Sequence, residues 1–339
     1  MKRIILSTIG LMAAVLFIPV VASPYVIYLS TEVLIMAIFA MSLGLIMGFG
    51  GMPSLGHSAL FGLGAYTVVA LSQYVSNVYV LLGAALILTL IFSLITGFIA
   101  MRNTGIFFLM VTLAFTQVLY LISSGMNLWG GADGMSTMVR ANFGFGNIAS
   151  STGLFYMIGV FFVLSYFLLK VYTSSPMGKI LKGVMENESR MTALGFNPKI
   201  FKTAAYTLAG GMAGIAGALY IYKNQFVSPE LFSVHTAAEA MIMVFIGGYG
   251  TIFGPALGAG AFVFIENYVS SFTDRWSLIL GLIFIAIVML KRGGIIHLLS
   301  LAWNSIVRMR KKMFSERKRN VVEVKEEEEM VNERITKSQ

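Results

Sequence analysis

The sequence predicts an all-α, polytopic membrane protein with about ten transmembrane helices, some of them broken by glycine and proline. Of its residues 57% are hydrophobic and only 12% are charged, and the mean hydropathy is +0.83. Soluble domains carry about 25% charged residues. Apolar segments of about 20 residues, long enough to cross a bilayer as a helix, recur along most of the chain. These observations exclude a soluble globular domain.

Ten membrane spans follow from the pattern of apolar segments. They lie at about 4–22, 25–47, 58–76, 78–101, 105–123, 153–171, 201–222, 237–250, 254–272 and 276–290. Lys2 and Arg3 precede the first span, so the positive-inside rule places the N-terminus in the cytoplasm. Ten crossings return the C-terminus to the same side. The expected localisation is a prokaryotic cell (inner) membrane, with residues 1–302 as the permeation domain and 303–339 as a cytoplasmic tail.

The first span has an alternative interpretation as a secretory signal peptide. The basic start MKR is followed by an apolar run and by the small-residue segment Val20-Val21-Ala22. The apolar run is long for a signal peptide, which favours a retained helix. Cleavage would leave nine spans in the same orientation.

The tail changes its charge along its length. Residues 308–320 hold seven basic side chains and one acidic one, whereas residues 321–339 hold six acidic and three basic ones. The basic part could lie along anionic lipid headgroups, and the acidic part is typical of a disordered segment. A solvated tail that enforces orientation is favoured over a regulatory role.

The segment 173–202 is a polar island between two spans. Ser174 or Ser175 followed by Pro176 predicts a helix start, and Gly195 predicts its end. Between them, apolar residues recur at helical spacing opposite a charged face; they are Met177, Ile180, Leu181, Val184, Met191 and Leu194. An amphipathic helix on the cytoplasmic face that docks a partner is one interpretation. An ordinary interfacial helix is the other.

Two segments, 48–66 and 247–261, combine glycine and proline where spans meet the cytoplasm. Each contains Pro-x-Leu-Gly, which predicts a following helix with proline near its first turn. In the first of them, Ser54 and His57 are spaced as a nucleophile and its base. No third residue orients the histidine, so a capping serine and a hydrogen-bonded histidine are favoured.

The sequence has no pattern typical of a metal site or of a nucleotide-binding site. The chain has no cysteine, and its three histidines lack the H-E-x-x-H spacing of a zinc site. It also lacks a Walker-type glycine loop, so we expect no cofactor and no ATP binding by the chain itself. Nothing predicts a nucleic-acid partner.

Three carboxylates, Glu32, Glu239 and Glu266, fall inside predicted spans. A charge at the centre of a lone helix costs about 3 kcal/mol, so such residues usually face a bundle interior or water. Counted along their helices, all three lie in the outer half of the membrane. A path for a cationic or zwitterionic solute would explain them, and so would snorkelling or interhelical hydrogen bonds, which we favour for Glu239.

The outer loop 124–152 is polar and rich in glycine. Its run Gly130-Gly131-Ala132-Asp133-Gly134 predicts a tight turn. The loop could also present a surface to an external partner.

Several motifs in series resemble one family. They are SLGHSALFGLGAYT, GGADGM, GKILKGVMENESRMTALGFNPKIFK, AGGMAGIAGALY, SPELFSV, MVFIGGYGTIFGPALGA and KRGG. Together they resemble branched-chain amino-acid ABC transporter permeases, the LivM-type subunit in particular, over roughly residues 30–294. The tail after Trp303 is longer than the family leads us to expect. Urea and short-amide permeases share much of the pattern.

The resemblance implies an importer and its partners. These would be two ATP-binding subunits, a second homologous permease subunit and an extracytoplasmic solute-binding protein, around a chain that is no enzyme. It also implies that residues 176–195 meet an ATPase. Their most characteristic positions are Glu186, Asn187, Glu188, Arg190 and Gly195.

The expected mechanism is alternating access driven by ATP. The binding protein would dock outside, near the loops 124–152 and 223–236, with Gly131, Asp133 and Gly134 as candidate contacts. The candidate translocation path is formed by Glu32, Ser54, His57, Gly62 and Gly64. We also expect Glu186 and Arg190 to pair at i,i+4 spacing on the docking helix.

Two other classes of protein are considered. An ion-driven transporter would need a titratable relay near the midplane, against which the outer placement of the glutamates argues. A membrane-embedded enzyme would need more than the Ser54–His57 pair.

Overall fold

The computed structural model describes residues 2–125, 130–137, 141–142, 147–148, 150–273, 275, 278–279, 281–282 and 285. These residues form eleven α-helices, two 3-10 turns and four two-residue strands, and they belong to one compact unit, residues 1–295. The predicted tail 303–339 and most of the tenth predicted span, 276–290, lie outside the described residues.

Nine of the predicted spans coincide with helices. They are α1 (Lys2–Val21), α2 (Pro24–Gly50), α3 (His57–Ser72), α4 (Val78–Ala100), α5 (Ile106–Gly125), α6 (Ser151–Ser174), α9 (Pro198–Asn224), α10 (Val234–Gly247) and α11 (Phe253–Ser270). Five of these, α2, α4, α5, α6 and α9, are both long and apolar enough to cross a membrane. The helical membrane class is therefore confirmed, but a count of ten crossings is not. Helix α10, with 14 residues, spans only about 21 Å.

Two helices begin where a capping polar residue precedes proline. Asn197 before Pro198 begins α9, and its side chain accepts a hydrogen bond from the backbone N–H of Lys199. Ser175 before Pro176 begins α7 (Pro176–Glu186) and accepts from Gly178 in the same way. Proline suits this position because its missing N–H would be unpaired there anyway.

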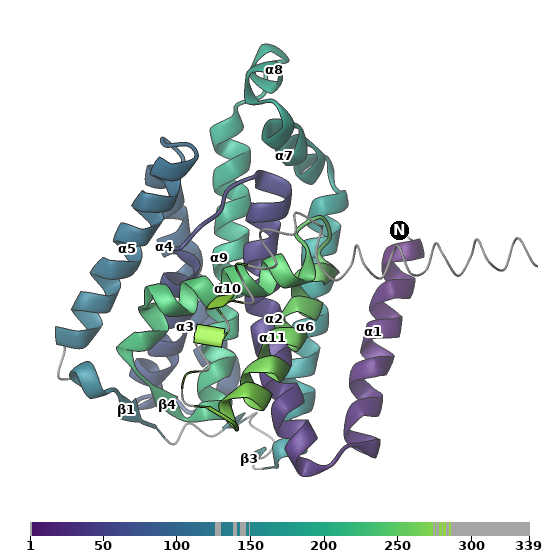
Figure 1. The fold of residues 1–339 in the computed structure, drawn as a ribbon, viewed down its shortest axis with the longest axis vertical. Helices are drawn as coiled ribbons and strands as arrows, with labels where there is room; N and C mark the ends of the chain where they lie inside the picture. The colour runs from purple at the N-terminus through teal and green to yellow at the C-terminus, as the bar shows by residue number, and fades with distance from the viewer. Residues whose placement is uncertain are drawn as a thin grey trace, which may run out of the picture. The chain divides into compact units, whose positions relative to one another are not determined.

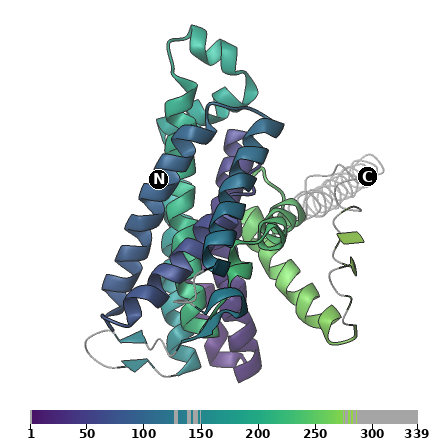
Figure 2. The ribbon, with the colours of Figure 1, turned by 90° about the vertical axis from the view of Figure 1, so that its left-hand side faces the viewer.

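Helix α9 forms the centre of the bundle and packs against α2, α3 and α4 (Figures 1 and 2). Glycine makes this close packing possible. A Cβ at Gly64 of α3 would overlap the backbone of Gly214 in α9, and one at Gly217 would overlap the carbonyl of Phe61. Small residues of this kind let helix backbones approach where side chains would hold them apart.

The two Pro-x-Leu-Gly segments differ in structure. Pro255 lies in the first turn of α11, as predicted, and packs against Gly44 of α2. Pro53 instead lies in a non-helical segment four residues before α3, which begins at His57 close to the predicted 58, so proline is not in the first turn of this helix. This non-helical segment begins at Gly51 with φ +65°, a left-handed conformation that ends α2.

The polar island is two helices rather than the single predicted one. Helix α7 ends at Glu186, and α8 (Glu188–Ala193) begins after Asn187. Asn187 has extended backbone angles and caps α8, because its Oδ1 accepts a 2.8 Å hydrogen bond from the N–H of Arg190. The predicted i,i+4 pair of Glu186 and Arg190 is therefore wrong, since the two residues lie on different helices.

Helices α7 and α8 lie at one end of the bundle, and the short strands lie at the other (Figure 1). We call these the α8 end and the β1/β4 end. Strand β1 (Met135–Ser136) pairs antiparallel with β4 (Phe226–Val227), and β2 (Ala141–Asn142) pairs with β3 (Asn147–Ile148). Because β4 follows α9, the helix connects the two ends.

Candidate coupling surface and translocation site

Helix α7 is anchored to the bundle through its apolar face. Leu181 and Val184 are buried, and α7 contacts α2, α6 and α9. Gly178 lies directly against the backbone of Tyr172 and Thr173 at the end of α6, where a Cβ would overlap. The amphipathic pattern of the sequence thus separates a packed face from an outward one.

The outward face of the island combines exposed apolar and charged side chains. The predicted contacts Glu186, Asn187 and Arg190 are exposed at or next to α8. Gly195 is also exposed, and its φ of +89° makes the left-handed turn that ends α8. Large apolar residues stand exposed on the same segment, namely Met177, Met185, Leu194, Phe196 and Ile200. Apolar area with charge around it is typical of a protein-docking surface.

Glu188, the remaining one of the five predicted contacts, is turned toward the bundle. Its Oε2 accepts a 2.6 Å hydrogen bond from the Nζ of Lys202 in α9. Because the two residues are 14 positions apart and lie on different helices, no local pattern in the sequence predicts this pair.

At the β1/β4 end, the predicted tight turn is confirmed. Gly131–Asp133 form a 3-10 turn (η2), and Gly134 follows it with φ +74°. Asp133 is exposed. A Cβ on Gly134 would overlap the carbonyl of Val227, so this turn is seated on β4. The predicted docking loops 124–152 and 223–236 are thereby joined.

Glu32 is held in a buried ion pair. Its Oε2 lies 2.8 Å from the Nζ of Lys223 in the last turn of α9, and that ammonium also lies 4.0 Å from the ring centroid of Tyr28. The side chains are 23% exposed for Glu32 and only 2% for Lys223. The sequence placed Lys223 in an outer loop, so it missed this partner. A basic residue at the end of a span was the available signal.

The other two spanning carboxylates lie near this pair. The charge of Glu239 in α10 interacts with those of Glu266 in α11 and Glu32 in α2. Glu239 Oε1 is also 3.3 Å from Nδ1 of His235, one turn earlier. We call Glu32, Glu239, Glu266 and Lys223 the charged cluster. It brings three carboxyl groups and one ammonium together near the β1/β4 end.

Ser54 and His57 do not form a nucleophile–base pair. The Ser54 hydroxyl accepts a 3.1 Å hydrogen bond from the N–H of Gly56, which is a turn-capping role. His57 is fully buried, and its ring meets that of Tyr206 edge to face at 5.8 Å. Neither ring nitrogen has a hydrogen-bond partner in the part of the chain that the structure describes. The favoured helix-cap serine is wrong, because the N-cap of α3 is Gly56 and it has no side-chain hydrogen bond, and the favoured hydrogen-bonded histidine is wrong too.

Gly62 and Gly64 stand at packing contacts. A Cβ on Gly62 would meet the ring of Phe232 in the 3-10 turn η3 (Pro229–Phe232), and Gly64 faces Gly214. Both residues hold α3 close to its neighbours. Among the described residues there is also no group of histidine, aspartate and glutamate side chains that could hold a metal ion.

Comparison with known proteins identifies the family. Residues 25–289 match the family described as "branched-chain amino acid transport system / permease component". The chain belongs to this family. The permease is 24% identical over 303 residues to the high-affinity branched-chain amino acid transport system permease protein LivM of Escherichia coli K12, which covers 82% of this chain and 71% of that protein. No solved structure matches the chain.

Two further relatives support the same assignment. The permease is 25% identical over 293 residues to LivM of Salmonella typhimurium, covering 79% of this chain and 69% of that protein. It is 22% identical over 287 residues to a probable LivM of Methanocaldococcus jannaschii, covering 73% and 82%. The permease is therefore a multi-pass transport component rather than an enzyme.

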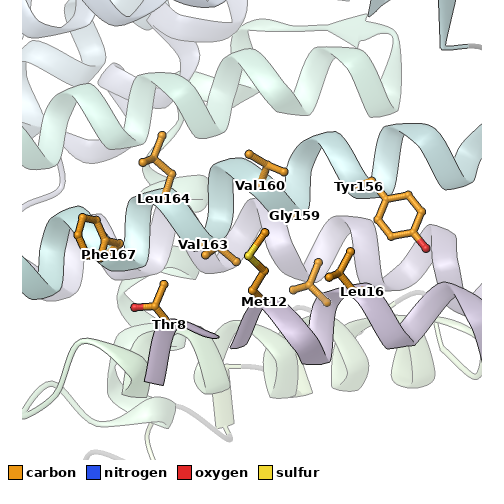
Figure 3. Close-up of a pocket in the computed structure, with 10 residues that line it drawn as sticks. Thr8, Met12, Leu16, Tyr156, Gly159, Val160, Val163, Leu164 and Phe167 are labelled. Atoms are coloured by element: carbon orange, nitrogen blue, oxygen red, sulfur yellow. The ribbon is translucent and has the colours of Figure 1, made fainter. Parts of the chain in front are cut away.

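Three cavities formed by the described residues do not include the charged cluster. A groove of about 450 Å³ lies between α1 and α6, and its lining is almost entirely apolar (Figure 3). Met12 and Leu16 of α1 face Val160 and Val163 of α6 there. Such a groove offers no charged group to hold an amino acid's ammonium or carboxylate. A smaller cavity at the α8 end is polar and contains Glu188 and Lys202.

Proposed function

We propose that the permease is the membrane-spanning subunit of an ATP-binding-cassette importer for branched-chain amino acids. Two separate ATPase subunits bind the α8 end, a second homologous permease subunit completes the pore, and an extracytoplasmic binding protein delivers the substrate. The observation that carries the proposal is the match to the permease family over residues 25–289. The exposed α7–α8 element supports it, because a subunit that lacks its own nucleotide site needs a surface for one that has it.

In this proposal the α8 end faces the cytoplasm. Basic side chains concentrate there, with Lys179, Lys182, Arg190 and Lys199 all exposed on the island. Cytoplasmic segments of membrane proteins carry such an excess of lysine and arginine. Both termini are then cytoplasmic, and the β1/β4 end faces outward.

The binding protein docks at the β1/β4 end. Strand pairing holds the η2 turn against β4, so Asp133 and the glycines beside it form one ordered surface. The charged cluster lies next to this end, since Lys223 is three residues before Phe226. A zwitterionic amino acid released there meets carboxylates that attract its ammonium. We therefore keep Glu32 as a residue of the translocation path, with Ser54 and His57 further along α3 and its preceding turn.

Purification from the native membrane tests the assembly. Tagged permease should bring ATP-binding subunits with it, and deletion of residues 176–195 should abolish their recovery while leaving the chain in the membrane. Recovery of the permease without any ATPase, under conditions that preserve other such complexes, would instead favour an ion-driven transporter.

Uptake measurements test the substrate. Cells that carry the complete system should accumulate labelled leucine, isoleucine or valine in an ATP-dependent manner. Accumulation of labelled urea or acetamide in place of these amino acids would assign the permease to the amide importers, which resemble it in sequence.

A further inference from the structure

Lys202 is a largely covered charged residue. Its side chain is 10% exposed, so together with Lys223, at 2%, it is one of two lysines whose ammonium is covered by an ion pair. It lies at the α8 end, in the second turn of α9. A buried ammonium requires a counter-charge. Glu188 supplies it at 2.6 Å, across from α8.

Helix α8 has little else to hold it to the bundle. None of its residues is buried, in contrast to α7, which buries Leu181 and Val184. Met191 touches Gly183, but that contact ties α8 only to α7. Apolar packing therefore positions α7, whereas a single ion pair connects the side chains of α8 to α9.

The Glu188–Lys202 ion pair also lies beside α7, the turn after α2 and the α4–α5 connection. It lines a cavity of about 160 Å³ together with Val184 and Met185 of α7. The remaining wall comes from the turn after α2 and from the α4–α5 connection, namely Gly50, Gly51, Met52, Pro53, Asn103, Thr104, Gly105 and Phe108. The Glu188 side chain is 43% exposed, so water reaches its outer edge while Lys202 stays covered.

Helix α9 extends from this ion pair to the opposite end of the bundle. It is buried along most of its length by α2, α3 and α4. At its far end Lys223 pairs with Glu32. The two lysines are 21 positions apart, which corresponds to about 32 Å along a helix, close to the thickness of the hydrocarbon core. A shift of α9 at Lys202 thus reaches the charged cluster directly.

We propose that the Glu188–Lys202 ion pair is the latch through which the ATPase-driven movement of α8 is transmitted to α9. This inference rests on the proposed function, because it takes the α7–α8 element as the surface that an ATPase moves. Glu188 is then a positioning residue, whose carboxylate binds Lys202 of α9 rather than the ATPase. Its exposed neighbours Glu186 and Arg190 provide the charges that face the ATPase.

A charge swap tests the latch. In the complete transporter, Glu188→Lys and Lys202→Glu should each lower uptake about tenfold or more while ATPase subunits still co-purify. The double variant Glu188→Lys/Lys202→Glu restores the attraction and should recover most of the uptake. The matched control is Glu188→Lys/Lys199→Glu, which has the same net charge but places the acid one turn earlier on an exposed position. It should not recover uptake.

A second measurement reads the latch in the purified permease without partners. Amide hydrogen exchange of residues 188–193 should accelerate in each single variant and in the conservative Glu188→Gln. It should return toward the wild-type rate in the double swap only.

The outcomes separate the latch from the proposed function. Exchange that is unchanged in the single variants, or a double swap as defective in uptake as the singles, would overturn the latch and leave Glu188 as a direct partner contact. A wild-type permease that binds no ATPase overturns the proposed function, and with it the role of the latch in coupling, whatever the exchange rates show.

Discussion

At the scale of single residues, the charged cluster combines a buried lysine with three carboxyl groups. Lys223 is 2% exposed and sits between the carboxylate of Glu32 and the ring face of Tyr28. Such a buried cation is tolerated because a carboxylate and an aromatic ring replace its hydration. Glu239 and Glu266 place two further carboxyl groups near this pair. The Glu32–Lys223 pair thus has a structural role beside two carboxyl groups that Lys223 does not bind.

The first prediction separates these two roles of Glu32. Glu32→Gln leaves Lys223 buried without a full counter-charge, which should cost roughly 3 kcal/mol and lower the midpoint of thermal unfolding by several degrees. Uptake should fall as well. Thermal unfolding of purified protein and uptake per molecule in the membrane measure the two effects.

The control removes both charges together. Glu32→Gln/Lys223→Met should recover the unfolding midpoint, since no unpaired charge remains. Uptake that stays low in this double variant assigns Glu32 to the path. Normal uptake by Glu32→Gln, with normal amounts in the membrane, would remove Glu32 from it.

The second prediction concerns the glycines between helices. Gly64→Ala should strongly reduce the amount of folded permease, because its Cβ overlaps the backbone of Gly214. Gly83→Ala in α4 is the matched control, since nothing lies within 4 Å of its Cβ. It should be neutral or slightly stabilising, as alanine is favoured over glycine in helices by about 1 kcal/mol. Equal amounts of both variants, measured by fluorescence-detected size exclusion, would contradict this packing.

At the scale of elements, the break between α7 and α8 shapes the docking surface. Asn187 ends one helix and caps the next, so α8 is redirected and Glu188 meets Lys202. Asparagine competes for backbone hydrogen bonds in this way when a helix and a turn are both available. The apolar periodicity of the sequence continues to Leu194 and hides the break, although Leu194 is 65% exposed and does not share the packed face of α7.

The third prediction tests this joint. Asn187→Ala removes the cap, at a typical cost of about 1 kcal/mol, and should speed amide exchange across residues 188–193 and lower uptake. Asn77→Ala removes a similar cap, the 2.9 Å bond to the N–H of Tyr79 at the start of α4, and should leave uptake unchanged. If both variants transport alike, the joint has no part in coupling.

At the scale of the whole molecule, the bundle has two ends with different character. The α8 end exposes basic and apolar side chains, and the β1/β4 end holds glycine turns beside the charged cluster. Because the chain has no cysteine, a single introduced cysteine can report on which side of the membrane each end lies.

The fourth prediction fixes the orientation. An impermeant maleimide should label Asp133→Cys in intact cells, where the β1/β4 end faces outward. It should label Lys179→Cys only after permeabilisation, because the proposed topology places α7 in the cytoplasm. The opposite pattern would reverse the proposed topology and remove the α8 end as an ATPase site.

Much of the fold is readable from the sequence because each helix satisfies its own backbone within the bilayer. The apolar runs predicted α2, α4, α5, α6 and α9 to within a few residues, and the glycines of the 130–134 run predicted the turn found there. The ends of the short helices were predicted less well: α3 ends at Ser72 rather than at 76, and α10 lies three residues earlier than the predicted 237–250.

The candidate site divides in the same way. By itself, the sequence determined the membrane class, the amphipathic polar island and the presence of three carboxylates in apolar helices, because hydropathy, periodicity and charge are local properties. Only the tertiary structure decided the partners of those charges. It paired Glu32 with Lys223 and Glu188 with Lys202, and it packed Gly64 against Gly214. These contacts join residues far apart in the chain, and only the packing of α9 among its neighbours brings them together.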